Sequence, residues 1–378
     1  MLDLTKKESP DEIISAPGRY TSFWKKIFRA ANEKKASDIH AASIEEGLLI
    51  RFRIDGQLTV IEKVTNRSAA SELIVTLKRI ADADTGTRRI AQDTSFKLDA
   101  FASKYRFALS PGGNHGECVV MRIIRDEEPP ILDNLGMSPK ALEDLRWAAN
   151  QSQGFLLVTG PTGSGKSTTL QASIMDMDRY GLEVIAIEDP IERELPGVTH
   201  WRIRKGELDW DDAINTAMRS DPDVILVGEI RDELSASLAV KGANTGHLVM
   251  STLHTNSVVD TIDRLIQLKV RDFQIADNLL YVSAQRLLNT LCPHCKIRHG
   301  DYFIRNVKGC EACVLGIKGR KGIIEYLVNP EPEHIMTGNK EALRECLSQD
   351  LFGELRKCVE KGEVCHSLFE NAVKKGKF

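Results

Sequence analysis

Apolar residues follow two different patterns along this chain of 378 residues. Before residue 125, the segments FWKKIFRAAN (23–32) and SAASELIVTLKRIADAD (68–84) repeat apolar positions at helical spacing. The segment LLIRFRIDGQLTVI (48–61) predicts two strands joined at Asp55-Gly56, and SFKLDA, KYRFALS and ECVVMRIIR predict three more. Residues 20–125 are therefore predicted to form a compact α+β domain with an antiparallel sheet.

After residue 140 the apolar residues form short continuous runs. These runs are GFLLVTG (154–160), LEVIAIED (182–189), DVILVGE (223–229) and GHLVMSTL (246–253), and helical segments separate most of them. Such alternation predicts a parallel sheet that is covered on both faces. The class of the chain is thus α/β, with its main core at 140–290.

The remaining segments are assigned from their composition. Residues 1–19 contain two prolines and little periodic apolar content, which predicts a mobile tail. Residues 126–139 combine charges, Pro-Pro and a glycine, which is typical of a linker, here a hinge. A cysteine-bearing module is predicted at 291–325, and amphipathic helices at 326–378.

Composition and charge narrow the function classes. The chain is 42% apolar and 28% charged, as soluble globular proteins are, and its net charge of -3 gives no overall attraction to nucleic acid or anionic lipid. The first residues do not read as a secretory signal, and no apolar stretch approaches the length of a membrane span. Four of the eight cysteines form two CxxC pairs, which favours a reducing, cytoplasmic compartment with a metal site.

The segment GPTGSGKST (160–168) matches the phosphate-loop pattern GxxxxGK[ST], between a predicted strand and a predicted helix. Its glycines let backbone N–H groups surround a phosphate, and the helix dipole adds positive potential. Lys166 is predicted to reach the β- and γ-phosphates and Ser167 to bind magnesium. The predicted nucleotide-binding residues are Gly160, Pro161, Thr162, Gly163, Ser164, Gly165, Lys166, Ser167 and Thr168.

Carboxylates follow two of the predicted core strands. IEDPIE (187–192) supplies Asp189 and Glu192, which are predicted to orient metal and water, with Glu192 as a candidate general base. DVILVGEIRD (223–232) ends its strand in Gly228, so Glu229 supplies the carboxylate that glycine cannot. Taken alone, the first motif reads better as a solvated acidic loop and the second also reads as an exposed strand end.

Histidines and cysteines complete the candidate chemistry. TGHLVMSTLHTN (245–256) places His247 and His254 around a core strand, where a histidine can donate a hydrogen bond to the γ-phosphate or serve a structural role. The two CxxC pairs lie fourteen residues apart. Paired thiolates of this spacing predict a closed structural zinc site rather than buried or redox cysteines. Its ligands are Cys292, Cys295, Cys310 and Cys313.

The phosphate loop, IEDPIE, DPDVILVGEIRD and TGHLVMSTLHTN together resemble the secretion and type IV pilus assembly ATPases of the type II/IV secretion superfamily. ASDIHAAS, IRFRIDGQL, SAQRLLNTLCPHC and GCEACVLGIKGRKGIIEYL extend the resemblance over roughly residues 31–330. It implies a RecA-like ATPase core, a preceding PAS-like domain and a small zinc-binding insertion, in a short form without a large extra N-terminal domain. It also implies ATP, Mg²⁺ and Zn²⁺ as cofactors, and Arg106 and Arg122 as nucleotide contacts.

The same resemblance implies a cytoplasmic homo-hexamer that works at the inner face of the bacterial inner membrane. Each nucleotide lies between one subunit's core and a neighbour's preceding domain, and the motor drives a membrane platform protein that assembles a pilus or pseudopilus. Paired cysteines favour assembly over retraction or conjugation-type secretion. The resemblance leaves open pilus or secretion system, cargo, and whether Glu192 or Glu229 is the general base.

A nucleic-acid-remodelling ATPase with a zinc ribbon is the alternative from another class. Between Cys292 and Gly322 the sequence contains seven Lys or Arg residues against two Asp or Glu. That excess suits phosphates or an acidic protein surface equally. Because Tyr302 and Phe303 are the sole aromatic residues there, base stacking is not indicated and direct nucleic-acid binding is not expected. A scaffold that binds nucleotide without hydrolysis is a third possibility, which the intact carboxylate set disfavours.

Overall fold

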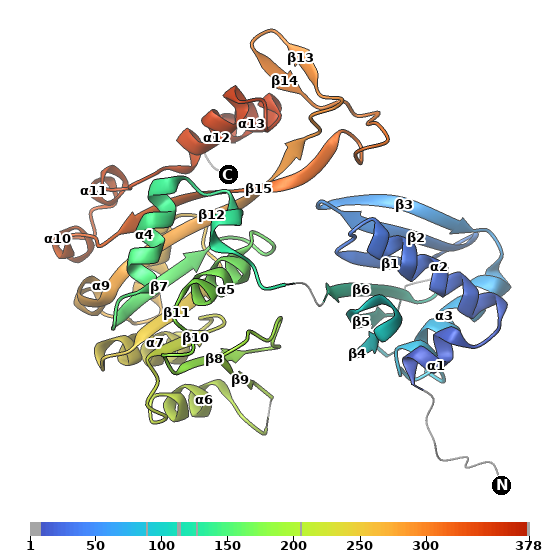
Figure 1. Ribbon diagram of the computed structural model, residues 1–378, viewed down its shortest axis with the longest axis horizontal. Coiled ribbons are helices and arrows are strands. Elements are labelled where there is room, and N and C mark those ends of the chain that lie inside the picture. The colour runs from blue at the N-terminus through green and yellow to red at the C-terminus, as the bar shows by residue number, and fades with distance from the viewer. Residues whose placement is uncertain (1–8, 88–89, 112–114, 126–127, 205, 376–378) are drawn as a thin grey trace. The chain divides into compact units, whose positions relative to one another are not determined.

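The computed structural model describes residues 9–87, 90–111, 115–125, 128–204 and 206–375. The chain divides into two compact units, Met1–Glu127 (unit 1) and Glu128–Phe378 (unit 2) (Figure 1). The division falls within the predicted linker 126–139. Each unit has its own sheet and its own core.

Unit 1 is built on a six-stranded sheet in the order β3-β2-β1-β6-β5-β4, in which every neighbouring pair is antiparallel. Along β5, buried and exposed residues alternate strictly, as expected for a sheet that packs on one face. The antiparallel sheet predicted from the sequence is confirmed. Its strands are β1 (Asp38–Ile44), β2 (Gly47–Ile54), β3 (Gln57–Val64), β4 (Gln92–Leu98), β5 (Ser103–Ser110) and β6 (Cys118–Arg125).

Helices α1 (Pro10–Ser15), α2 (Arg19–Glu33) and α3 (Arg67–Ile80) supply the other half of the unit 1 core. Phe28 on α2 packs edge-on against Tyr105 on β5, with ring centroids 4.9 Å apart. The fully buried Trp24 donates from Nε1 to the carbonyl oxygen of Leu73 on α3, at 2.8 Å. The buried face of the sheet is therefore the face that α2 and α3 cover.

Helix α1 contradicts the expectation of a mobile tail for residues 10–15. Ser9 accepts a hydrogen bond from the Glu12 N–H while Glu12 accepts one from the Ser9 N–H, which makes a capping box. Ile13 and Ile14 are buried in unit 1. Two adjacent isoleucines are enough to bind this helix of six residues to the core, which the composition of residues 1–19 did not indicate.

Unit 2 contains a seven-stranded sheet in the order β15-β12-β7-β11-β10-β8-β9. All neighbouring strands are parallel except β12 and β15, which are antiparallel. The four predicted apolar runs form the centre of the sheet, β7-β11-β10-β8. The strands are β7 (Gly154–Thr159), β8 (Val184–Glu188), β9 (Thr199–Arg202), β10 (Val224–Val227), β11 (Leu248–Leu253), β12 (Leu279–Leu291) and β15 (Ile317–Val328).

Helices cover both faces of this sheet, so the mixed α/β class is confirmed (Figure 1). One core cluster joins Leu156, Val158 and Met250 of the strands to residues of α4 (Pro139–Ala149) and α5 (Lys166–Asp176). The other joins the alternate strand residues to the remaining helices. These helices are α6 (Trp210–Ala217), α7 (Glu233–Asn244), α8 (Val258–Gln267), α9 (Asp272–Asn278), α10 (Pro332–Met336) and α11 (Lys340–Glu345).

The last part of the predicted hinge is fixed to unit 2. A 3-10 turn, η2 (Leu132–Leu135), buries Leu132 in the cluster of α4 and α5. Arg146 on α4 donates to Asp133 of this turn at 2.8 Å and to Asp176 at the end of α5 at 2.9 Å. Residues 132–135 therefore belong to unit 2.

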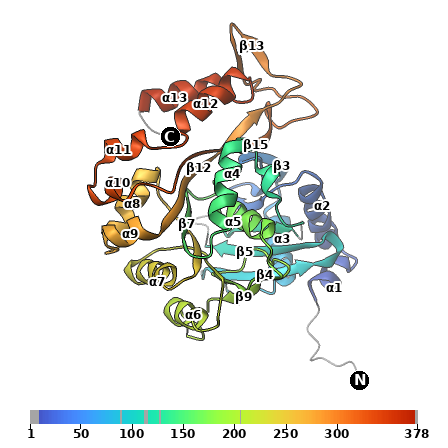
Figure 2. The same ribbon diagram turned by 60° about the vertical axis from the view of Figure 1, so that its left-hand side comes forward.

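The cysteine-bearing module extends from the far ends of β12 and β15 (Figure 2). It contains the short hairpin of β13 (Ile297–His299) and β14 (Tyr302–Ile304). Helices α12 (Leu351–Glu360) and α13 (His366–Lys375) contact β14, and the ring of Tyr302 stacks on that of His366. The module and the C-terminal helices are thus parts of unit 2.

Candidate active site

The phosphate-loop segment connects the carboxyl end of β7 to the amino end of α5. Gly160, Gly163 and Gly165 have φ values of 142°, 78° and 90°. Residues with a Cβ atom rarely adopt such positive values. A Cβ atom at Gly160 would lie 2.4 Å from the carbonyl oxygen of Gln285. Glycine is therefore required at Gly160 by both conformation and space, and the chain turns sharply enough to expose N–H groups to a bound phosphate.

Lys166 lies within this loop and is buried. Its ammonium donates to the carbonyl oxygens of Gly160 at 2.9 Å and Pro161 at 3.3 Å. Burial lowers the pKa of the Lys166 ammonium, and the negative charges of Glu229 and Glu192 act in the opposite direction. Both carboxylates are thus close enough to Lys166 to influence its charge.

The residues of the loop fit a phosphate group. The Ser164 hydroxyl is buried, and it has no hydrogen-bond partner among the described residues. Together with the positive-φ glycines and the Lys166 ammonium, it provides the donors that a phosphate requires. Ser167 follows in the first turn of α5 and is half-buried, which suits a hydroxyl that binds magnesium.

Glu229 stands at the same edge of the sheet, two residues after β10 (Val224–Val227). Its Oε1 lies 3.2 Å from Nε2 of His254, and its Oε2 accepts a hydrogen bond from Nε of Arg231 at 2.9 Å. A Cβ atom at Gly228 would lie 3.2 Å from the carbonyl oxygen of Ile187, a tight contact that favours glycine at this position. The structure therefore brings Glu229 and His254, two residues of the predicted site, into contact.

The aspartate-box segment follows β8 and places its carboxylates in two environments. Asp189 and Glu192 are exposed. Glu188, the last residue of β8, is buried, and its Oε1 lies 3.2 Å from Nδ1 of His200. His200 also accepts the Leu195 N–H at Nε2, so Nδ1 carries the proton and donates to Glu188. Glu192 lies close enough to Lys166 for its charge to act on the ammonium. Among the described residues, no hydrogen bond or ion pair connects Asp189 to the phosphate loop.

His247 is a correction to the predicted site. Its carbonyl oxygen accepts the Gly154 N–H, and its Nδ1 lies 3.0 Å from the carbonyl oxygen of Gly242 at the end of α7. Gly154 begins β7, whereas the phosphate loop follows the end of β7. Six strand residues separate the two ends by roughly 20 Å, so His247 lies at the opposite edge of the sheet and is removed from the site.

The two predicted arginines of unit 1, Arg106 and Arg122, occupy one face of its sheet together with Arg53. Arg106 on β5 is opposite Arg122 on β6, which is opposite Asp38 on β1, which is opposite Arg53 on β2. Arg106 pairs with Asp93 at 3.0 Å and Arg122 with Asp38 at 3.2 Å. Because alternate residues of β5 and β6 form the core, this row lies on the face opposite the helices.

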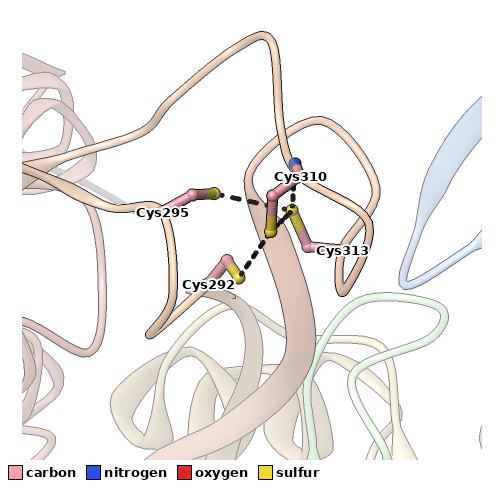
Figure 3. A group of neighbouring side chains, drawn as sticks. All are labelled: Cys292, Cys295, Cys310 and Cys313. Atoms are coloured by element: carbon pink, nitrogen blue, oxygen red, sulfur yellow. Dashed lines mark hydrogen bonds between the residues drawn. The ribbon is translucent and has the colours of Figure 1, made fainter.

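The four paired cysteines come together at the far end of β12 (Figure 3). Their sulfur atoms all lie within 4.8 Å of one another. The Cys292–Cys310, Cys295–Cys313 and Cys310–Cys313 sulfur distances are 3.8, 3.6 and 3.6 Å. Sulfur atoms about 2.3 Å from a tetrahedral metal stand about 3.8 Å apart, so the donor set fits a four-coordinate metal ion.

Residues 18–370 match the family described as Type II/IV secretion system protein. The chain belongs to this family. Among relatives of known name, "Protein transport protein HofB homolog" of Escherichia coli K12 is 36% identical over 333 residues, covering 84% of this chain and 72% of the relative. "Type II secretion system ATPase E" of Vibrio cholerae is 37% identical over 319 residues, covering 79% of this chain and 63% of the relative. The chain thus spans less than two thirds of that second protein.

A solved member of similar fold is the structure described as "Pilus Retraction Motor PilT and Bound ADP". It aligns with a TM-score of 0.65 and 26% identity, covering 92% of this chain and 96% of that one. In the part of the chain that the structure describes, no helix combines the length and apolar character needed to cross a membrane.

Three residues of this family member were missed by the sequence analysis. Glu188 belongs to IEDPIE, but only the acidic residues that follow it, Asp189 and Glu192, were predicted to act in the site. His200 belongs to no motif in the sequence, so nothing predicted its contact with Glu188. Arg286 on β12 is buried, and its positive charge acts on Lys166. Its strand, Leu279–Leu291, has Ser283, Gln285 and Asn289 among its apolar residues. Because these polar residues interrupt the apolar run, the sequence did not predict this strand.

Proposed function

We propose that this chain is an ATP-hydrolysing motor that powers assembly of a type IV pilus or a type II secretion pseudopilus. The observation that carries the proposal is the arrangement at the carboxyl edge of the unit 2 sheet. There, Glu229 is held by His254 and Arg231, and Glu229 acts on the ammonium of Lys166. A phosphate loop with an oriented carboxylate beside it suits phosphoryl transfer to water.

The residues of unit 2 divide this chemistry between them. The loop N–H groups and Lys166 would hold the phosphates of ATP, and the Ser167 hydroxyl would hold Mg²⁺, which neutralises phosphate charge when bound. Glu192 and Glu229 are the two candidates for orienting water and accepting its proton. Glu192 is exposed and uncommitted to a described hydrogen bond, which favours it as the base, while Glu229 is anchored by two partners.

Arg106 and Arg122 are proposed to complete the site of a neighbouring subunit in a homo-hexamer. Both are exposed on one face of the unit 1 sheet and lie opposite each other on adjacent strands. A cation supplied to the γ-phosphate stabilises the charge of the transition state. Because residues 132–135 are fixed to unit 2, we propose only the part of the 126–139 segment that precedes the η2 turn as the hinge through which nucleotide state changes the angle between the units.

The four cysteines are proposed to hold zinc in a closed structural site. Tetrahedral sulfur ligation is the geometry that zinc prefers, and four thiolates leave no position open for substrate. The proposed role is to hold the module between β12 and β15 in one conformation.

The motor is proposed to work in the cytoplasm, at the inner face of the inner membrane, through a membrane platform protein. Relatives named for protein transport and type II secretion support this context. Direct action on nucleic acid is not part of the proposal.

The experiment is phosphate release by the full chain under conditions that favour ring assembly, compared with Lys166→Ala. Steady ATP-dependent release that Lys166→Ala abolishes, unchanged by added DNA, supports the proposal. Nucleotide binding without release identifies a scaffold instead, and strong stimulation by DNA indicates a remodelling enzyme. Deletion of the gene, scored for surface pili and for secretion, then separates the two machines.

A further inference from the structure

Strand β12 contacts two separate parts of the candidate site through consecutive residues. Gln285 serves the phosphate loop: its Oε1 accepts a hydrogen bond from Thr169 of α5 at 2.8 Å, and its carbonyl oxygen lies against Gly160. A Cβ atom at Gly165 would lie 2.8 Å from Nε2 of Gln285. The loop is therefore built directly on this residue.

Arg286 serves the segment after β11. Its Nη2 donates to the carbonyl oxygen of Asn256 at 2.7 Å and lies 3.3 Å from the Asn256 side-chain oxygen. Its Nη1 donates to the Gln285 carbonyl oxygen at 3.1 Å, the same oxygen against which Gly160 packs. The guanidinium thus joins the floor of the phosphate loop to the residues that follow His254.

A second connection holds the same segment from β7. Thr159, which precedes the loop, accepts a hydrogen bond from the Thr261 hydroxyl at 3.2 Å, and Thr261 lies 2.6 Å from the Thr255 hydroxyl. Thr159 also donates to the Ser283 carbonyl oxygen on β12 at 3.0 Å. Thr255 and Asn256 are therefore connected both to β7, which leads into the phosphate loop, and to β12, on which the loop packs.

We propose that Arg286 is a positioning residue for the proposed hydrolysis: its guanidinium fixes the segment 254–256 and thereby the contact between His254 and Glu229. The proposal rests on the proposed function. Arg286 is buried and carries a charge in a dry environment, a cost that two backbone acceptors and the nearby Glu325 offset.

The fork of the guanidinium distinguishes this role from a simple positive charge. Lysine keeps the charge but cannot donate along two fixed directions from one planar group. Arg286→Lys therefore removes positioning and leaves charge. If the charge of Arg286 acted on the phosphates directly, Arg286→Lys would retain most of the turnover.

The matched control is Arg179→Lys. Arg179 likewise donates to two backbone carbonyl oxygens, those of Pro196 at 2.8 Å and Met175 at 3.0 Å. Met175 is near the last residue of α5, whereas Lys166 is its first, which separates the control from the loop. Arg179→Lys thus measures the effect of losing an arginine that binds two backbone carbonyls, at a position away from the loop.

The test measures kcat for phosphate release and Kd for adenylyl imidodiphosphate on the full chain. Arg286→Lys is expected to lower kcat about 10- to 100-fold, as misplacement of a catalytic contact does, while Kd changes less than about threefold. Arg179→Lys is expected to match wild type in both. In a His254→Ala background, the further loss caused by Arg286→Lys is expected to shrink below about threefold.

Three results overturn the role of Arg286: wild-type kcat in Arg286→Lys, an undiminished loss in the His254→Ala background, or a rise in Kd that accounts for the loss. Thermal unfolding of each variant identifies one that has failed to fold, and Arg286→Gln, a neutral and shorter donor that cannot reach Asn256, then takes its place with the same expected loss. If the wild-type chain itself releases no phosphate, the proposed function fails and this role with it. Turnover by wild type with unchanged Arg286 variants rejects the role alone.

Discussion

The two sheets of this protein present their candidate chemistry in opposite ways. The unit 2 sheet is covered on both faces, so its functional residues lie in the segments that leave the carboxyl ends of β7, β8, β10 and β11. The unit 1 sheet is covered on one face, and its arginines stand on the other, each from a different strand. The candidate residues thus lie at the carboxyl ends of strands in unit 2 and on an open face of the sheet in unit 1.

This difference determines how far the position of each candidate residue depends on the residues around it. The phosphate loop and Lys166 are held by backbone turns and by the buried Gln285 of β12, so replacing a residue there disturbs a preorganised site. The arginines of unit 1 are exposed, but their partners differ: Arg106 pairs with the exposed Asp93, whereas Arg122 pairs with the buried Asp38. Replacing Arg106 therefore leaves the fold of that unit nearly unchanged, and replacing Arg122 leaves Asp38 with its contacts to Ser37 and Arg53. The predictions below separate the two cases.

The largest effect is expected for Glu229→Gln. Glutamine keeps the shape of the side chain but removes the negative charge that faces His254 and Lys166. We expect kcat for phosphate release to fall about 1000-fold, with nucleotide still bound, because the lost interaction forms part of the transition state. Rapid-quench turnover and analogue binding measure the two quantities, and normal turnover would remove Glu229 from the mechanism.

A loss of about 100-fold or more in kcat is expected for Arg106→Ala and Arg122→Ala. Arg106→Ala should keep the melting temperature close to that of wild type, because its partner Asp93 is exposed, whereas Arg122→Ala should lower it somewhat, because its partner Asp38 is buried. Lys104→Ala is the control, since Lys104 is exposed on the same face of β5, two residues from Arg106. Equal losses in all three variants would mean that the face acts through its general charge rather than through these two arginines.

The smallest effect on turnover is expected at the cysteine cluster. Cys292→Ser or removal of metal by a chelator should abolish zinc binding and lower the melting temperature, because the module then loses the ion that joins its four thiols. Phosphate release should change less than about threefold, since a closed site takes no part in the chemistry. Zinc analysis, calorimetry and turnover on one preparation check this, and a parallel loss of turnover and zinc would place the module in the catalytic cycle.

Much of the fold, and of the candidate site at the carboxyl ends of the unit 2 strands, could be predicted from the sequence. Both depend on contiguous segments of the chain. GPTGSGKST, DVILVGE and the four apolar runs each specify a strand and the turn that follows it. Parallel strands then bring those turns to one edge. Glu229, His254 and the phosphate-loop residues needed no long-range information.

The errors arise where the answer depends on which end of a strand a residue occupies or on what packs against it. His247 and His254 belong to one sequence motif, but β11 runs between them and places them at opposite edges. Glu188 and His200 meet only when β9 pairs with β8. Arg286 is buried because β15 pairs with β12. The sequence did not predict β12 as a strand, since polar residues interrupt its apolar pattern.

The central claim is that the unit 2 site of one subunit is completed by the unit 1 arginines of another, and mixing two inactive variants tests it directly. Glu229→Gln retains the arginines, and the double variant Arg106→Ala/Arg122→Ala retains the core. In a randomly mixed ring, about one quarter of the interfaces pair an intact core with intact arginines. Phosphate release is therefore predicted to recover to about one quarter of the wild-type rate. A mixture that binds nucleotide but never exceeds the activity of its parents would contradict the account.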